Sequence, residues 1–225
     1  IWSGFSGGGP RQFAALGDGR AVFGANDVIH GMELWITDGT AAGTVLLRDI
    51  RAGSNWSDPS GITALGDGRA VFRANDGIHG IELWITDGTT AGTVLLRDIM
   101  TGSAGSYPRY FTALGGGRAV FQATDGIHGR ELWITDGTPA GTVLLRDIAG
   151  GSGSSVPHNL TTLFLNVVPT LTAPFSDASA TEGDAFTLTL PGGAFFDPDV
   201  PGPDSLTLSA SLAGGGPLPG WLSFN

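Results

Sequence analysis

ELWITDGT occupies residues 33–40, and the same eight residues return at 82–89 and at 131–138. The tryptophans of the three copies, Trp35, Trp84 and Trp133, follow one another at intervals of 49 residues. A fixed period of this length is typical of solenoids, propellers and other repeat arrays. The fold is therefore predicted from the repeat and not from any single segment.

The repeat is wider than these eight residues. GDGRAVF at 17–23 returns at 66–72 and, with Gly116 in place of Asp, at 115–121, and GTVLLRDI at 43–50 returns at 92–99 and 141–148. Leu163 continues the same spacing, which predicts a partial fourth unit. The units are therefore about 2–50, 51–99, 100–148 and a partial 149–165. Ile1 lies 49 residues before Ile50, so we expect further repeats upstream that complete the array.

Four short strands are expected in each unit, as the second one illustrates. Apolar and β-branched runs at 62–65, 69–74, 81–86 and 93–99 are separated by turns that contain glycine. A four-stranded antiparallel meander that is repeated radially forms a β-propeller. Apolar residues on consecutive positions, as in Val94-Leu95-Leu96, indicate sheets covered on both faces.

The predicted fold class is thus all-β, a β-propeller-like array of 49-residue units, with a β-solenoid as the competing architecture. Three copies fall short of the roughly four to eight blades that close a propeller. We therefore expect this stretch, taken in isolation, to have an open edge.

Composition narrows the classes of function. The 225 residues are 41% hydrophobic, which is enough for a packed core, and carry a net charge of −10 with no lysine. An acidic chain repels phosphate backbones, which argues against nucleic acid as a partner. Cysteine is absent, which removes disulfides and thiolate metal sites. No apolar run is long enough to cross a bilayer, so we expect no membrane insertion.

The repeat unit resembles a known family. ELWITDGT followed by AGTVLLRDI, with DGIHG before it, is similar to the ELWxxDGT repeat that occurs in tandem in large bacterial secreted or surface proteins. The resemblance covers residues 17–148. It implies an extracellular or cell-surface repeat array and brings no established activity or ligand.

A different pattern follows the repeats. After a Gly/Ser-rich linker at 149–155, alternating strands are expected at 185–190 and 205–211. ATEG at 180–183, FDPD at 196–199 and LPGWLSFN at 218–225 resemble dystroglycan-type cadherin-like domains, which are immunoglobulin-like sandwiches. The resemblance implies a truncated domain of this kind at 166–225, after a repeat array at 1–165.

One imidazole and two carboxylates recur in each unit and form a candidate metal site. Carboxylates suit Ca²⁺ and histidine suits transition metals, so this mixed set fits no single ion well. We favour a structural interpretation, in which the histidine closes a turn and the glutamate makes a hydrogen bond or ion pair across the sheet. The three sets are Asp27, His30 and Glu33; Asp76, His79 and Glu82; and Asp125, His128 and Glu131.

Three further repeated positions have two interpretations each. The tryptophans, Trp35, Trp84 and Trp133, stack on sugars or pack in the core, and we favour the core. The Asp-Gly pairs that begin at Asp38, Asp87 and Asp136 are tight-turn residues by default, with calcium binding as an unsupported alternative. The Arg48-Asp49 pair and its copies line a ligand-binding ring or, as we prefer, join adjacent units by ion pairs.

The sharper calcium candidate lies in the C-terminal segment. Asp197 and Asp199 place two carboxylates on one turn, and hard oxygen ligands suit Ca²⁺. The resemblance adds Glu182 and Asn166 to this set. Leu163-Phe164-Leu165 replaces the acidic residues that normally precede that asparagine, so calcium and a plain acidic turn both stay open. No other cofactor is expected.

No catalytic arrangement is found, and repetition itself argues against one, because an enzyme needs a unique set of groups. We expect a non-enzymatic extracellular or cell-surface protein for adhesion or ligand binding, with a cell-surface protein or glycan as partner. The alternatives are an accessory region of a large secreted hydrolase and a carbohydrate-binding propeller.

Overall fold

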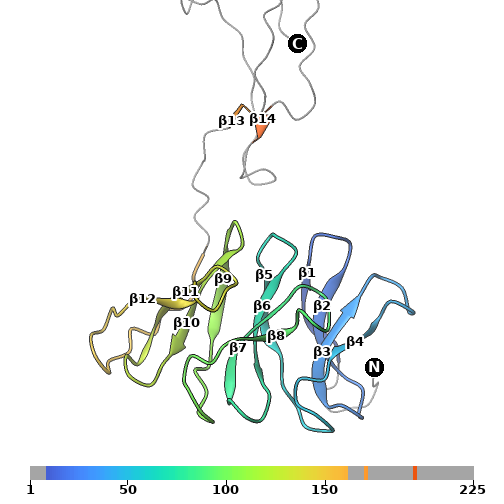
Figure 1. The fold of residues 1–225 in the computed structure, drawn as a ribbon, viewed down its shortest axis with the longest axis horizontal. Helices are drawn as coiled ribbons and strands as arrows, with labels where there is room; N and C mark the ends of the chain where they lie inside the picture. The colour runs from blue at the N-terminus through green and yellow to red at the C-terminus, as the bar shows by residue number, and fades with distance from the viewer. Residues whose placement is uncertain (1–8, 162–169, 172–194, 197–225) are drawn as a thin grey trace, which may run out of the picture. The chain divides into compact units, whose positions relative to one another are not determined.

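The computed structural model describes residues 9–161, 170–171 and 195–196 (Figure 1). The chain divides into two compact units, Ile1–Thr162 and Leu163–Asn225, three residues before the boundary expected at 166. The C-terminal strands expected at 185–190 and 205–211 lie outside the described residues, as do the four calcium candidates, Asn166, Glu182, Asp197 and Asp199.

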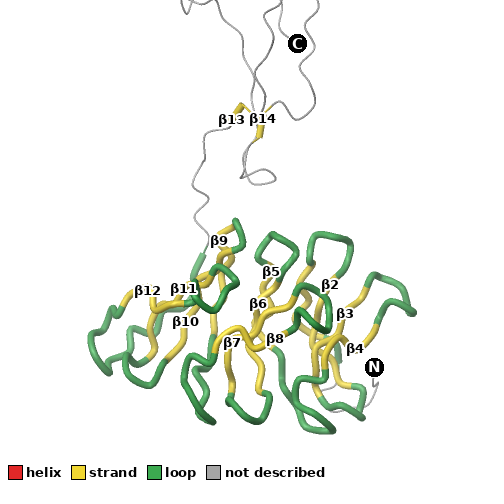
Figure 2. The backbone as a smooth tube through the Cα atoms, viewed as in Figure 1, coloured by secondary structure: helices red, strands yellow, loops and turns green. Residues whose placement is uncertain are grey.

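Each complete repeat folds into one four-stranded antiparallel sheet in which consecutive strands are neighbours (Figure 2). The first sheet contains β1 (Arg11–Ala15), β2 (Ala21–Asn26), β3 (Met32–Thr37) and β4 (Val45–Arg48). The second contains β5 (Ser60–Ala64), β6 (Ala70–Asn75), β7 (Ile81–Thr86) and β8 (Val94–Arg97). The third contains β9 (Arg109–Gly115), β10 (Arg118–Thr124), β11 (Arg130–Thr135) and β12 (Val143–Arg146).

The strands expected from the sequence match these elements closely, and β7 coincides with its expected range. Of the second unit, the described residues form a two-stranded antiparallel pair, β13 (Thr170–Leu171) and β14 (Phe195–Phe196). The repeats are antiparallel sheets, unlike the coils of a parallel β-solenoid. The part of the chain that the structure describes includes no helix long and apolar enough to span a membrane.

Strand register is the same in all three repeats. Trp35 lies opposite Phe23, Trp84 opposite Phe72 and Trp133 opposite Phe121. An identical register places the same side chains on the same face of each sheet, because side chains alternate between the faces with a period of two. The three sheets therefore present the same two faces.

The sheets lie side by side, with β1 against β5 and β5 against β9. We call the face that packs against the following sheet the trailing face and the opposite one the leading face. The first interface joins Val22, Leu34 and Ile36 of the first trailing face to Phe72 and Trp84 of the second leading face.

The second interface repeats this packing one unit later. Val71, Leu83 and Ile85 of the second trailing face meet Phe121 and Trp133 of the third leading face. The middle sheet is thus covered on both faces, as the runs of consecutive apolar residues predicted.

Candidate functional site

The repeated aspartate and histidine form a pair at the turn between the second and third strands. The Nδ1 atom of His79 lies 2.6 Å from Oδ2 of Asp76, and the backbone N–H groups of Ile78 and His79 donate to Oδ1 of the same carboxylate. The first and third repeats contain the same pair, Asp27 with His30 and Asp125 with His128, at 2.6 and 2.7 Å. Each aspartate therefore both closes the turn and orients the imidazole ring.

This pairing changes the pKa values of both partners. The hydrogen bond to Asp76 raises the pKa of His79 above its ordinary value. Burial opposes ionisation of Asp76, but the hydrogen bonds from His79 outweigh it and lower the pKa of Asp76. The pair therefore favours an imidazolium beside a carboxylate.

The repeated glutamate faces a different set of partners. Glu82 is fully buried and accepts hydrogen bonds from the backbone N–H groups of Ile99 (2.9 Å) and Ser106 (2.7 Å) and from the Ser106 hydroxyl (2.5 Å). Glu33 binds Ile50 and Ser57 in the same way. The carboxylate thereby ties the end of its own sheet to the connector that leads to the next.

The surroundings of these glutamates differ along the array. Burial raises the pKa of Glu33 to about 7, against the opposing hydrogen bonds from Ser57 and Ile50, and it raises the pKa of Glu82 as well. Burial also favours a higher pKa for Glu131, but the hydrogen bonds from Ser155 and Ile148 outweigh this effect and lower the pKa of Glu131. No further repeat sheet covers the third sheet among the described residues, which accounts for the weaker desolvation.

These contacts separate the residues of the candidate metal set. Asp27 and His30 are brought together, whereas the Glu33 carboxylate is used by Ser57 and Ile50. Among the described residues, no group of three or more His, Asp or Glu side chains is arranged to hold a metal ion.

The Asp-Gly-Thr segment forms a turn whose polar groups hydrogen-bond to one another. Asp87 accepts from the backbone N–H (2.8 Å) and the hydroxyl (2.7 Å) of Thr89, and Thr86 and Thr93 join their hydroxyl groups across the turn (2.8 Å). The Asp87 carboxylate occupies the space that a Cβ atom of Gly92 would need. The spacing of aspartate and glycine is therefore a steric requirement, and Asp38 and Asp136 repeat it.

The tryptophans lie in the packed interior. Trp84 belongs to the core between the first and second sheets and Trp133 to the core between the second and third. Trp35 is also buried, beside Phe23 and Ala25. None of the three indole faces is open to a sugar ring.

The Arg-Asp pairs do join neighbouring sheets, but the ion pairs expected from the sequence are wrong. Arg48 donates to the carbonyl of Thr90 (3.1 Å), and Arg97 donates to the carbonyls of Pro139 (2.8 Å) and Thr142 (2.6 Å). The aspartates beside these arginines are used elsewhere, since Asp49 and Asp98 accept hydrogen bonds from the backbone N–H groups of Gly53 and Gly102 in their own connectors.

Two sets of interface residues were not identified from the sequence. The serines Ser57, Ser106 and Ser155 are the partners of the glutamates, 24 residues away. Arg20 and Arg69 reach 68 residues along the chain, to the carbonyls of Gly88 and Gly137. Recurrence at the 49-residue period was the signal available for both sets.

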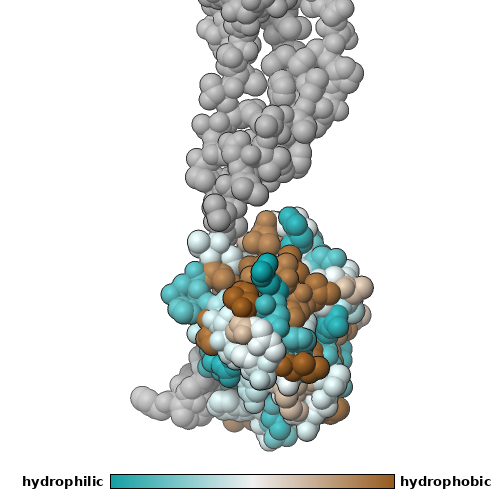
Figure 3. Space-filling view, turned by 90° about the vertical axis from the view of Figure 1, so that its left-hand side faces the viewer, coloured by the Kyte–Doolittle hydropathy of each residue, from teal (hydrophilic) through white to brown (hydrophobic). Residues whose placement is uncertain are grey.

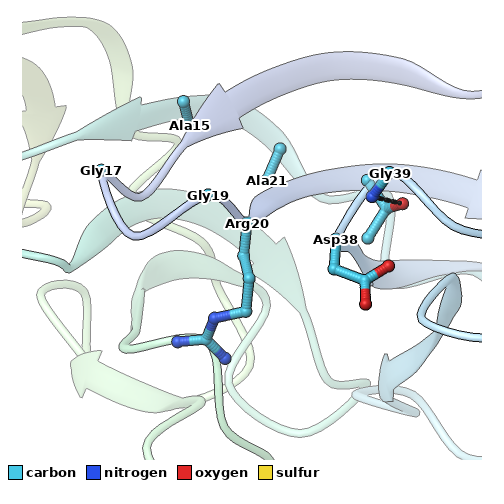
Figure 4. Close-up of a pocket in the computed structure, with 8 residues that line it drawn as sticks. Ala15, Gly17, Gly19, Arg20, Ala21, Asp38 and Gly39 are labelled. Atoms are coloured by element: carbon cyan, nitrogen blue, oxygen red, sulfur yellow. Dashed lines mark hydrogen bonds between the residues drawn. The ribbon is translucent and has the colours of Figure 1, made fainter.

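A pocket of about 400 Å³ lies at the first sheet, between the β1–β2 turn with Gly17 and Gly19 and the β3–β4 turn with Asp38 and Gly39 (Figure 4). Its other lining residues are Ala15, Arg20, Ala21 and Thr37. The polar side chains of this lining are one guanidinium, one hydroxyl and one carboxylate, those of Arg20, Thr37 and Asp38.

The exposed tips of the β2–β3, β6–β7 and β10–β11 turns carry one isoleucine each. Ile29, Ile78 and Ile127 are 70%, 69% and 68% exposed. Each lies directly before the histidine of the Asp–His pair, whose ring stays about one third exposed. The three repeats therefore present the same apolar tip beside the same imidazole.

Comparison with known families finds a match in the C-terminal segment. Residues 168–225 match the family model described as "Putative Ig domain". This match supports an immunoglobulin-like domain there, in agreement with the broader part of the sequence-based expectation.

Comparison with solved structures finds a partial likeness to the crystal structure of puromycin hydrolase S511A mutant complexed with PGG. The TM-score is 0.42 at 21% identity, over 62% of this chain and 22% of that chain. This chain thus spans less than a quarter of that protein, and a likeness of this size carries no argument about fold or activity. No curated protein matches the chain.

Proposed function

We propose that this chain is a non-enzymatic, extracellular or cell-surface binding protein in which a propeller-like array displays repeated tips to a multivalent partner. The observation that carries the proposal is the threefold repetition of an exposed isoleucine beside a histidine whose side chain is about one third exposed. Isoleucine at about 70% exposure contributes little to folding, so its repetition needs another reason.

The contacts of the other signature residues support this choice. Glutamate, aspartate and tryptophan in the repeat are each used by the fold, through connectors, turns and cores. The tips are not. A partner with a repeating surface, such as a cell-surface protein or glycan, binds such tips by avidity, because weak contacts joined on one scaffold add in free energy.

Propeller geometry is part of the proposal. Adjacent first strands, four-stranded antiparallel sheets and apolar cores between successive sheets are all features of propeller blades. The extracellular location rests on the resemblance to surface repeats and on the family match of the C-terminal segment. The cadherin-like assignment of residues 166–225 belongs to the same proposal.

The binding role is tested with a triple variant in which Ile29, Ile78 and Ile127 are each replaced by serine. The matched control replaces Val45, Val94 and Val143 by serine, since these valines are also repeated and exposed in every unit. We expect retention on intact cells and on a glycan array to fall more than tenfold for the isoleucine set and to stay unchanged for the valine set. Equal retention of the isoleucine and valine variants would exclude the isoleucine tips as the binding surface.

Calcium binding in the C-terminal segment is a separate part of the proposal. Asp199→Ala and EDTA are each expected to lower the melting temperature of the second unit, by removal of oxygen ligands and of the ion respectively. A melting temperature that is indifferent to calcium contradicts it.

A further inference from the structure

One ion pair of the first repeat loses its acidic partner in the third. Arg11, at the start of β1, is paired with the carboxylate of Asp58, which precedes β5. Two repeats further along the chain, the same two positions hold Arg109 and Val156. The arginine is kept, but an apolar side chain replaces the carboxylate that would neutralise it.

The backbone at Val156 follows the backbone at Asp58. The N–H group of Asp58 donates to the carbonyl of Met32 at 3.2 Å. The N–H group of Val156 donates in the same way to the carbonyl of Arg130, the residue equivalent to Met32, at 3.2 Å. The φ angles are 51° for Asp58 and 47° for Val156, a region that a β-branched residue rarely adopts. Val156 therefore occupies the position of the missing carboxylate.

The guanidinium of Arg109 is consequently left without a partner. Its side chain makes no hydrogen bond or ion pair with the residues that the structure describes, and its Nε atom is buried. A buried N–H group that lacks an acceptor is unfavourable. An acceptor from outside these residues would remove this cost.

A second arginine lies close to Arg109. Arg73 reaches from β6 to the hydroxyl of Ser60 on β5 (2.8 Å), and β5 packs against β9, which begins at Arg109. Burial and, to a smaller extent, the charge of Arg109 lower the pKa of Arg73, whereas Asp58 acts in the opposite direction. Because Asp58 is already engaged by Arg11, two like charges meet between the second and third sheets without a carboxylate of their own.

Arg73 is also a departure from the repeat. The first and third repeats have Gly24 and Gln122 at this position, and their sheets keep the same register, so the sheet does not require an arginine there. Figure 3 shows the side of the molecule on which the third sheet lies, where hydrophobic and hydrophilic residues are interspersed. Arg73 and Arg109 are both partly buried, and partly buried charges are screened less by salt than exposed ones.

We propose that Arg73 and Arg109 bind an oxyanion, which takes the place of the carboxylate that is missing at Val156. The Nε atom of Arg73 is used by Ser60, so its two terminal nitrogens remain as donors, and Arg109 offers all of its N–H groups. Guanidinium groups match the paired oxygens of such anions, and two positive charges favour a divalent one such as sulfate or a phosphate monoester. The site uses none of the isoleucine tips.

NMR of the arginine Nε–H signals tests the site in the full chain, with sulfate replacing chloride at constant ionic strength. We expect saturable shifts for Arg73 and Arg109 and none for Arg11, which has its own carboxylate. Arg109→Gln should weaken the apparent Kd about tenfold or more, because charge-assisted hydrogen bonds are lost. Arg130→Gln removes an exposed arginine and should leave the Kd unchanged. Shifts that rise linearly and equally at all arginines indicate screening alone and overturn the proposal.

Restoring the carboxylate is the sharper test. Val156→Asp should supply Arg109 with the partner that Arg11 has, and so weaken sulfate binding about tenfold or more while the chain stays folded by circular dichroism. Val156→Ala is the matched control and should bind as the wild type does. Unchanged binding in Val156→Asp overturns the assignment.

A parallel titration distinguishes the two sources of such an anion. Glucose 6-phosphate that binds more tightly than inorganic phosphate shows a group carried on a larger ligand, and equal affinities show a site for the free anion. Failure of both phosphates and of sulfate to saturate the two arginines overturns the proposal.

Discussion

Replacing Glu82 with alanine removes the acceptor that ties the second sheet to its following connector. The backbone N–H groups of Ile99 and Ser106, both buried, lose their partner, whereas the Ser106 hydroxyl can rotate toward another acceptor. A buried donor without a partner costs roughly 1–3 kcal/mol. Two such donors give an expected loss of about 2–6 kcal/mol in the free energy of unfolding.

The third repeat contains a matched control for this change. Glu131 makes the same contacts, but Ile148 is exposed and Ser155 is only partly buried. Water can therefore replace the lost acceptor, and Glu131→Ala should cost about 1 kcal/mol. Glu82→Gln retains one acceptor oxygen and should fall between the two alanine variants.

Urea unfolding followed by tryptophan fluorescence measures these differences, and amide hydrogen exchange reports on Ile99 and Ser106 directly. If Glu82→Ala and Glu131→Ala lose the same free energy, the assignment of the cost to buried donors is refuted.

Three further predictions follow from the same contacts. Arg69→Gln should lower the free energy of unfolding by about 1–2 kcal/mol, because its contacts with the next sheet are lost. Arg118→Gln should change the free energy of unfolding by less than about 0.5 kcal/mol. Urea titrations of both variants measure these free energies. Val28 has a φ of 75° where the other repeats have glycine, so Val28→Gly should stabilise the chain by about 1 kcal/mol in the same assay. Asp76 raises the pKa of His79 above 6.5. The Asp76–His79 pair therefore stabilises the fold fully below pH 6.5, and this stabilisation fades as the pH rises through the folded-state pKa. An NMR titration of His79 should show the raised pKa, and Asp76→Asn should abolish the shift.

The strands could be predicted because the repeat supplies three versions of one pattern. Positions that stay apolar in every copy, such as Val71 and Leu83, define the covered faces, and glycine marks the turns. The strands expected in the second repeat consequently agree with β5 to β8 to within a few residues. The propeller arrangement was predicted by the same reasoning and stays a prediction.

The partners of the signature residues were not predictable in the same way. The contact of Glu82 with Ser106 spans 24 residues, and that of Arg69 with Gly137 spans 68. Neither follows from local spacing, since each depends on how one sheet sits against the next. The incorrect ion pairs of the Arg48-Asp49 copies have the same origin: backbone carbonyls of a neighbouring turn carry no sequence signal, although they are the better-placed acceptors.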